Sequence, residues 1–291
     1  MPSAVRSQHA PSFEPYEVAA FSASRRAVNE DSYFVATLKP FMSVSDVSPG
    51  VKWRGDVTGA PRGLLMMVAD GLGGLNHGAL ASKLAIEEAA GFTLSNVVAQ
   101  RSPLRVDGSG RQPDSYSRLT LPGLREQLMD VVAASDDAVR NEAKVRGEMG
   151  STLTLGYLLW PLLYVAHVGD SRAYVLKDGQ LLQVTKDHSL GAQAAELGFD
   201  DLAGQWHDSL WNCLGDTHRC AAPELHKVVL EPHSRWLFTS DGFHSFVSPE
   251  QILEMAMEAQ SAPQIAQSLV QKALSNGADD DVTVIFGRYL W

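Results

Sequence analysis

The stretch LLMMVADGLGG, residues 64–74, decides the fold. Its apolar half, residues 64–69, is a short run of the kind that forms a buried β-strand. Asp70 follows at the end of this strand, where rigid backbone holds the carboxylate and its oxygens face outward. Gly71 comes next, and because glycine lacks a Cβ, its backbone carbonyl can approach a cation closely.

Acidic residues next to apolar strands recur along the chain. They are Asp70, Asp170 after LLYVAHVG, Asp241 after RWLFTS, residues 279–281 before VTVIF, and Glu30 with Asp31 before a strand near the N-terminus. One aspartate followed by glycine is a common turn signal. Five such groups from distant parts of the chain could converge on one edge of a sandwich. Oxygen ligands of this kind select hard cations such as Mg²⁺ or Mn²⁺.

The order of predicted elements favours an α+β fold. Strands are predicted over residues 16–22, 32–36, 64–69, 152–159, 163–168, 173–177, 227–230, 235–239 and 282–289. Helices are predicted over residues 77–100, 121–146, 249–259 and 262–275, where apolar residues recur at helical spacing. Strands and helices do not alternate strictly, so we expect antiparallel sheets covered by helices rather than a parallel doubly wound sheet.

We expect one domain over residues 16–291, preceded by a flexible tail over residues 1–15. Residues 39–63 and 102–118 are rich in Ser, Pro and Gly and are predicted to be insertions in loops. The uncharged run over residues 151–169 approaches the length of a membrane span. Pro161 interrupts it and β-type residues recur through it, which favours two buried strands joined at residues 159–161.

Composition excludes several function classes. The formal net charge is −10 and the pI is about 5.3, whereas general nucleic-acid binding needs a basic surface. The two cysteines, Cys213 and Cys220, form no CxxC pair and no zinc-type spacing. We therefore expect free thiols in a reducing cytoplasm.

Seven short motifs resemble those of the metal-dependent protein phosphatases of the protein phosphatase 2C class, especially the bacterial ones. They are RAVNED (26–31), VADGLGG (68–74), GSTL (150–153), VGDSRAY (168–174), TKDHS (185–189), TSDG (239–242) and DDVT (280–283). The resemblance runs from Ser22 to Phe286, and the motifs stand in the family's order.

The resemblance implies a four-layer fold, a central antiparallel β-sandwich flanked by helix pairs. It also implies the site residues: Asp70 bridging two Mn²⁺ or Mg²⁺ ions, the Gly71 carbonyl on one ion, Asp241 and Asp280 as the other principal ligands, Glu30 and Asp31 near the second ion, Asp170 at a third, weaker ion, and Arg26 on the substrate phosphate. Two cations about 3.5–4 Å apart lower the pKa of a shared water, which gives a hydroxide that attacks phosphorus.

Three departures from the family pattern stand out. Some members carry a histidine where this chain has Leu72, which cannot donate a proton to the leaving group. Nearby His77 is a candidate replacement, although a surface histidine at a helix start is the better interpretation. The usual asparagine after the last metal ligand is Asp281 here, and residues 39–63 match no family feature.

A flap segment over residues 190–214 is expected beside the active site. Its Trp206, His207 and Trp211 either contact substrate or form the flap's own small core, and the core is favoured because tryptophans are usually well buried.

Three functions compete on this fold. The first is an active serine/threonine protein phosphatase, a monomer that acts on phosphorylated proteins opposite a cognate kinase, without nucleic acid or a membrane span. The second is a catalytically weak phosphoprotein-binding regulator, suggested by Leu72. The third is a phosphatase narrow to one partner, suggested by the ending Asp-Asp-Val-Thr. Intact Asp70, Asp241 and Asp280 favour the first.

Overall fold

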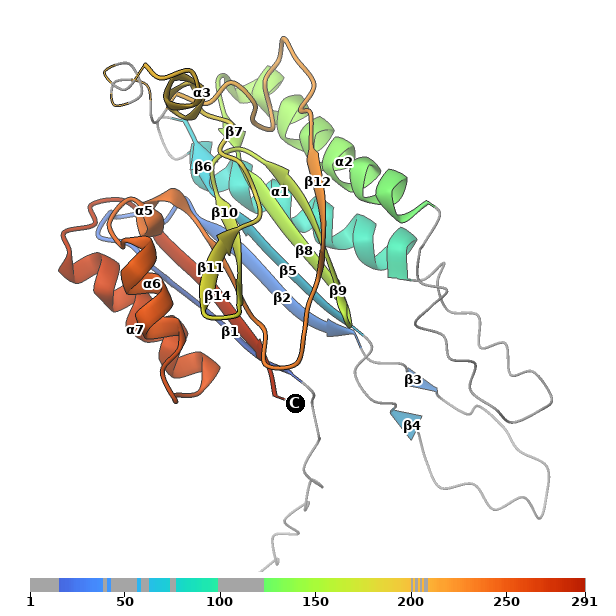
Figure 1. Ribbon diagram of the computed structural model, residues 1–291. Coiled ribbons are helices and arrows are strands. Elements are labelled where there is room, and N and C mark those ends of the chain that lie inside the picture. Colours follow the sequence, from blue (N-terminus) through green and yellow to red (C-terminus); the bar gives the residue numbers. More distant parts are fainter. Residues whose placement is uncertain are drawn as a thin grey trace, which may run out of the picture.

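Two antiparallel five-stranded sheets lie face to face at the centre of the computed structural model (Figure 1). The structure describes residues 16–38, 41–42, 57–58, 63–73, 77–98, 123–199, 201, 204, 206 and 209–290. The first sheet has the order β1 (Tyr16–Ala23), β14 (Val282–Tyr289), β13 (Arg235–Thr239), β10 (Arg172–Lys177), β11 (Gln180–Gln183). The second has the order β12 (Glu224–Val229), β9 (Leu162–Val168), β8 (Leu153–Leu159), β5 (Gly63–Ala69), β2 (Ser32–Leu38).

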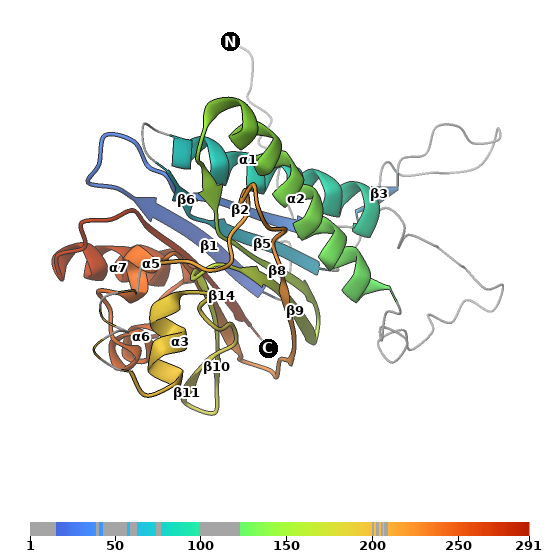
Figure 2. The same ribbon diagram turned by 90° about the horizontal axis from the view of Figure 1, so that it is seen from above.

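Helices cover the outer face of each sheet (Figure 1 and Figure 2). The second sheet carries α1 (His77–Phe92), which continues as a π-helical segment (Thr93–Val98), and α2 (Leu124–Arg146). The first sheet carries α5 (Asp241–His244), α6 (Pro249–Ala256) and α7 (Ala262–Ser275). The result is the predicted four-layer arrangement, with one apolar layer between the sheets and one beneath each set of helices.

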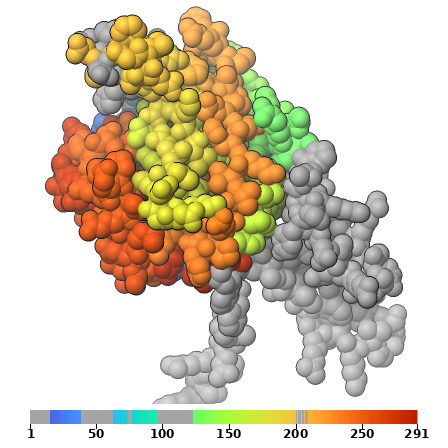
Figure 3. Space-filling view, in the orientation of Figure 1, coloured from blue at the N-terminus to red at the C-terminus, as the bar shows by residue number. Residues whose placement is uncertain are grey.

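Shorter elements complete the fold. The pair β6 (Gly71–Leu72) and β7 (Gly150–Ser151) follows the end of β5, and β3 (Phe41–Met42) pairs with β4 (Val57–Thr58). The helix α3 (Leu190–Glu196) lies at the same end of the view as β6 and β7, and the space-filling view shows it projecting from the body (Figure 3). All of these short elements were absent from the sequence prediction.

The predicted long elements are confirmed, with boundary shifts of a few residues. The helix predicted over residues 77–100 changes to π-helical geometry at Thr93, and β12 begins at Glu224 rather than at 227. The run over residues 151–169 forms the antiparallel hairpin of β8 and β9. Within the described ranges no helix is long and apolar enough to cross a membrane. The predicted tail (1–15), the insertion over 102–118 and most of that over 39–63 lie outside the described residues.

Close packing between the sheets depends on Gly156 in β8. A Cβ at this position would lie 2.3 Å from the Phe238 ring of β13, which is fully buried. The absence of a side chain at Gly156 therefore sets how closely the two sheets approach. A Cβ at Gly91, near the end of α1, would by contrast meet no heavy atom of the described residues within 4 Å.

This contrast predicts opposite effects of the same substitution at the two glycines. Gly156→Ala should lower the free energy of unfolding by about 1–3 kcal/mol, because the added methyl overpacks the Phe238 ring. Gly91→Ala should raise it by about 0.5–1 kcal/mol, because alanine favours the helix. Urea unfolding of both variants measures the effects, and equal changes at the two positions would contradict this account of the sheet packing.

Candidate metal centre

Asp70 lies where β5 ends, and hydrogen bonds hold its backbone on both sides. Its N–H donates to Thr152 Oγ1 (2.8 Å), and its carbonyl accepts from Thr152 N (2.9 Å) and Ser151 Oγ (2.9 Å). Thr152 Oγ1 also lies 2.7 Å from Ser171 Oγ, next to Asp170. These buried hydroxyls fix the strand ends that carry Asp70 and Asp170 relative to each other.

Gly71 allows three pieces of backbone to meet directly after Asp70. A Cβ at Gly71 would lie 2.1 Å from the Gly78 carbonyl oxygen in α1 and 2.8 Å from the Glu30 carbonyl oxygen. A Cβ at Gly78 would lie 2.6 Å from Glu30 Oε1 and 2.7 Å from the Gly71 carbonyl oxygen. The Glu30 carboxylate and the Gly71 carbonyl are therefore neighbours, a proximity that the sequence did not predict.

Asp31 is joined to the residue before Asp241 by a buried hydroxyl. Ser240 Oγ donates to Asp31 Oδ2 (2.7 Å) and accepts from Thr283 N (2.9 Å). Asp31 is 9% exposed. Asp241 begins α5 and interacts electrostatically with Asp31, Asp70 and Asp170. The segment after β5 and the two connections between the sheets, from β1 to β2 and from β9 to β10, thus meet around Asp241.

Arg26 lies at the more exposed side of this cluster. Its Nη1 forms a 2.8 Å salt bridge with Asp280 Oδ1 and lies 3.8 Å from Glu30 Oε2. The guanidinium side chain is 46% exposed, so it reaches both the carboxylates and solvent. The structure therefore brings all eight predicted site residues into one region: Arg26, Glu30, Asp31, Asp70, Gly71, Asp170, Asp241 and Asp280.

The carboxylates of the cluster repel one another in a buried setting. Burial raises the pKa of Asp31 to about 7, and the charges of Asp241 and Asp281 add to the effect. Burial, followed by the charges of Asp31 and Asp241, raises the pKa of Asp70 well above its usual range. Burial and Asp241 do the same to the pKa of Asp170. Such a cluster is unstable when fully ionised unless positive charge is added.

The residues present fit hard divalent cations. Their donors are carboxylate and backbone oxygens, which Mg²⁺ and Mn²⁺ prefer. The Oδ1 atoms of Asp31 and Asp281 are buried and accept no hydrogen bond from the described residues, so each has a lone pair available to a cation. Over the described ranges, no three acidic, histidine or cysteine side chains already surround a common point.

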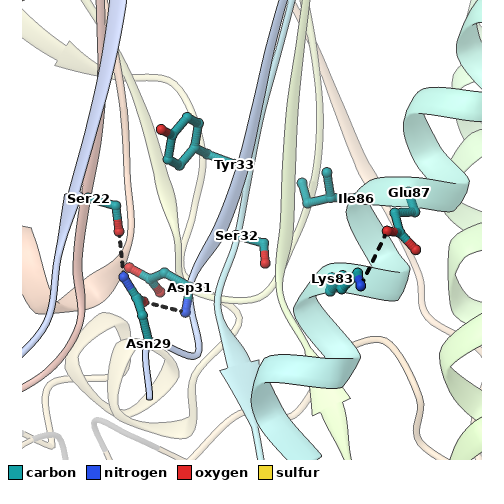
Figure 4. A pocket seen from close by; sticks show the side chains of 8 residues that line it. All are labelled: Ser22, Asn29, Asp31, Ser32, Tyr33, Lys83, Ile86 and Glu87. Carbon is teal, nitrogen blue, oxygen red and sulfur yellow. Dashed lines mark hydrogen bonds and ion pairs between the residues drawn. The ribbon is translucent and has the colours of Figure 1, made fainter. Parts of the chain in front are cut away.

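An open pocket of about 300 Å³ adjoins the cluster (Figure 4). Asp31, Asn29 and Ser22 lie together on one side of it, and the ion pair of Lys83 with Glu87 lies on α1 across from them. Asn29 donates to Ser22 Oγ (2.8 Å) and accepts from Asp31 N (2.9 Å). The loop that carries Glu30 and Asp31 is thus fixed by its own side chains.

The TKDHS segment (185–189) supports the loop that carries Asp170. Arg172 forms a two-pronged salt bridge with Asp187, at 2.8 and 2.6 Å. His188 Nδ1 accepts from Gly169 N (3.1 Å) and Asn212 Nδ2 (2.8 Å). His167 Nε2 lies 2.9 Å from the Lys186 carbonyl oxygen, so this buried histidine ties β9 to the segment.

The remaining predicted residues have mixed outcomes. His77 is the first residue of α1, as expected for a histidine at a helix start. Leu72 lies in β6, directly after Gly71. Trp211 packs against the His188 ring, with centroids 4.8 Å apart, so this contact is with the TKDHS segment that precedes the flap. Trp206 is 43% exposed, so the core interpretation is wrong for it, and His207 lies outside the described residues.

Sequence reasoning missed the hydroxyl groups that hold the carboxylates. Ser151, Thr152 and Ser240 stand inside the quoted motifs GSTL and TSDG, but spacing gave them no role. The sequence did contain a signal for these three hydroxyl residues, because each of them adjoins the end of an apolar strand. Unpaired backbone groups at buried strand ends need such partners.

Comparisons with known proteins agree with this geometry. The sequence profile of the family described as protein phosphatase 2C matches residues 55–276. The serine/threonine protein phosphatase PstP of Mycobacterium tuberculosis is 30% identical over 76% of this chain and 39% of its own length. The serine/threonine phosphatase stp of Listeria monocytogenes is 26% identical over 76% of this chain and 82% of its own.

Solved structures extend the likeness to the fold. The catalytic domain of PstP in complex with two manganese ions superposes with a TM-score of 0.69 at 26% identity, over 95% of this chain and 99% of that one. Fold and relatives together define a phosphoric monoester hydrolase of the serine/threonine protein phosphatase class. The chain belongs to the protein phosphatase 2C family.

The buried histidine predicts a pH dependence of stability. Burial, followed by the nearby His188, lowers the pKa of His167 to about 3, against about 6.5 in an unfolded chain. Between these values the unfolded chain binds a proton that the folded protein does not. The stability contribution is therefore complete above about pH 6.5 and falls on acidification, by up to about 1.4 kcal/mol per pH unit.

Urea unfolding between about pH 7 and pH 5 measures this slope. His167→Gln should remove that part of the slope, and His218→Gln, at an exposed histidine, should keep the wild-type slope. Identical slopes in all three proteins would show that His167 gains its proton without unfolding.

Proposed function

We propose that this chain hydrolyses phosphoserine and phosphothreonine in proteins with two divalent cations, Mn²⁺ or Mg²⁺, gathered at Asp70. The observation that carries the proposal is the burial of Asp70 among Asp31, Asp170 and Asp241, which leaves an excess of negative charge. The two manganese ions described for the PstP catalytic domain support it.

The ligand assignment follows the positions of the oxygens. Asp70 would hold both ions, the Gly71 carbonyl and Glu30 would add oxygen donors for one of them, and Asp241 would add a carboxylate for the other. Asp280 and Asp31 would complete the set, and Asp170 would serve a third, weaker site. Paired cations of this kind lower the pKa of water and offset charge on phosphoryl oxygens.

The protein's own residues prepare the site in two ways. Ser151, Thr152 and Ser240 hold Asp70 and Asp31 in place, so that little reorganisation is needed when substrate binds. Arg26 exchanges its salt bridge with Asp280 for the phosphate of the substrate, which its planar fork can grip with two hydrogen bonds. Leu72 supplies no proton, so the leaving oxygen takes its proton from water or from another side chain.

The surroundings of the enzyme are proposed from the same class assignment. Phosphoprotein substrates require a serine/threonine kinase that makes them. We further propose that the chain acts as a monomer in the cytoplasm, where Cys213 and Cys220 remain free thiols, as they are in the structure.

Removal of one metal ligand should abolish turnover. Asp241→Asn should lower Mn²⁺-dependent hydrolysis of p-nitrophenyl phosphate and of a phosphothreonine peptide by at least about 100-fold, because one charge that holds the ions is lost. Asp178→Asn, an exposed aspartate between β10 and β11, is the matched control and should keep wild-type activity. Hydrolysis that persists in excess EDTA would refute the role of cations.

Arg26 should act mainly on substrate binding. Arg26→Ala should raise KM for the phosphothreonine peptide by about tenfold or more, since a hydrogen bond to a charged group contributes about 1.5–3 kcal/mol. Arg26→Lys should recover part of the loss, because it restores charge without the fork. Arg25→Ala, whose guanidinium instead donates to the Leu274 carbonyl, should leave KM unchanged. An unchanged KM in Arg26→Ala would remove Arg26 from the phosphate site.

A further inference from the structure

Asp281 is a buried carboxylate that the ligand set above does not use. Asp281 is 2% exposed, and its Oδ2 accepts a 2.7 Å hydrogen bond from Glu30 N. Its Oδ1 is buried and has no hydrogen-bond partner among the described residues. Burial of an ionised oxygen without a hydrogen-bond partner lowers the stability of the folded protein. A function for Asp281 Oδ1 would explain why it is there.

The three aspartates of residues 279–281 occupy different environments. Asp279 is exposed. Asp280 is 37% exposed at its side chain, and its Oδ1 is taken by Arg26 (2.8 Å) and by Asp281 N (2.7 Å). Only Asp281 turns inward among these three, toward the loop that carries Glu30.

Asp281 shares its surroundings with Asp31 and Asp241. Ser240 Oγ lies 2.7 Å from Asp31 Oδ2 and 3.4 Å from the Asp281 carbonyl oxygen, so one hydroxyl contacts both residues. A Cβ at Gly242 would lie 2.1 Å from that same carbonyl oxygen, so Asp281 also packs on the residue after Asp241. Near Asp281, the Oδ1 atom of Asp31 is a second buried oxygen that accepts no hydrogen bond from any described residue.

Holding the loop does not require the charge of Asp281. An amide oxygen would accept the Glu30 N–H equally well and would avoid the desolvation of a carboxylate. Arg26 is the positive side chain nearby and its charge also acts on Asp281, but its close contacts are with Asp280 and Glu30, and no salt bridge joins it to Asp281 within the described part of the chain. A bound cation would supply the positive charge in direct contact with Asp281 that Arg26 does not.

We infer that Asp281 is a further cation-binding residue, whose Oδ1 serves the divalent cation that Glu30 and Asp31 also face. The inference rests on the proposed function, because it concerns the same pair of ions. It adds one carboxylate to that side of the centre. The extra negative charge should strengthen Mn²⁺ or Mg²⁺ binding and lower the stability of the metal-free protein.

Calorimetric titration of metal-free protein with MnCl₂ tests this assignment in the wild type, Asp281→Asn and Asp279→Asn. The asparagine at 281 keeps an oxygen for Glu30 N–H and removes only the charge. We expect Asp281→Asn to weaken one Mn²⁺-binding step by about tenfold or more, as the loss of a close charge pair implies. Asp279→Asn removes the same charge at an exposed position and should bind Mn²⁺ as the wild type does.

Thermal unfolding separates an electrostatic role from a structural one. Asp281→Asn should raise the melting temperature of the metal-free protein, because a buried repulsion is gone, and should reduce the rise that Mn²⁺ produces. A residue that only holds the loop would lower the metal-free melting temperature or leave it unchanged. If Asp281→Asn proves less stable, Asp281→Ser, which also removes the charge, must still weaken Mn²⁺ binding.

The outcomes distinguish this inference from the proposed function. Equal Mn²⁺ affinity in Asp281→Asn and Asp279→Asn, with a wild type that binds Mn²⁺ and hydrolyses the phosphothreonine peptide, overturns the role of Asp281 alone. If Asp281→Asn binds Mn²⁺ more weakly than the wild type does, but the wild type shows no phosphatase activity, the role of Asp281 is supported and the proposed function is overturned. A wild type that binds no Mn²⁺ contradicts both.

Discussion

The crowding of buried carboxylates at one edge of the sandwich is the constraint on which the rest of the structure depends. Asp31, Asp70 and Asp170 all have pKa values raised by burial and by neighbouring negative charges. Only a rigid frame can hold such groups together against their repulsion. The two sheets and their helices supply that frame, and added cations are the natural means of relieving the repulsion.

Small residues and hydroxyl groups make this frame possible. Gly71 and Gly78 let the end of β5, the start of α1 and the Glu30 loop come within direct contact. Ser151, Thr152 and Ser240 then satisfy the backbone and carboxylate groups that this approach buries. The chain around the site is thus specified by residues that contribute no chemistry of their own, which is why function and local packing cannot be separated here.

Much of the fold could be predicted because the long elements carry strong local patterns. The apolar run over residues 64–69 and the helical spacing in residues 124–146 mark their elements without tertiary information. The pairing of β6 with β7 joins segments far apart in the chain, so no local pattern marks it, and α3 carries only a short local signal, the N-cap at Ser189. The motifs predicted that the eight candidate residues lie in one region, whereas the inward turn of Asp281 rather than its neighbours is a property of the folded loop.

Anomalous X-ray diffraction from crystals grown with Mn²⁺, recorded at the manganese absorption edge, tests the central claim most directly. The account predicts two strong peaks about 3.5–4 Å apart, both within coordination distance of the Asp70 carboxylate. Peaks confined to other carboxylates, or no peak beside Asp70 at saturating Mn²⁺, would contradict it.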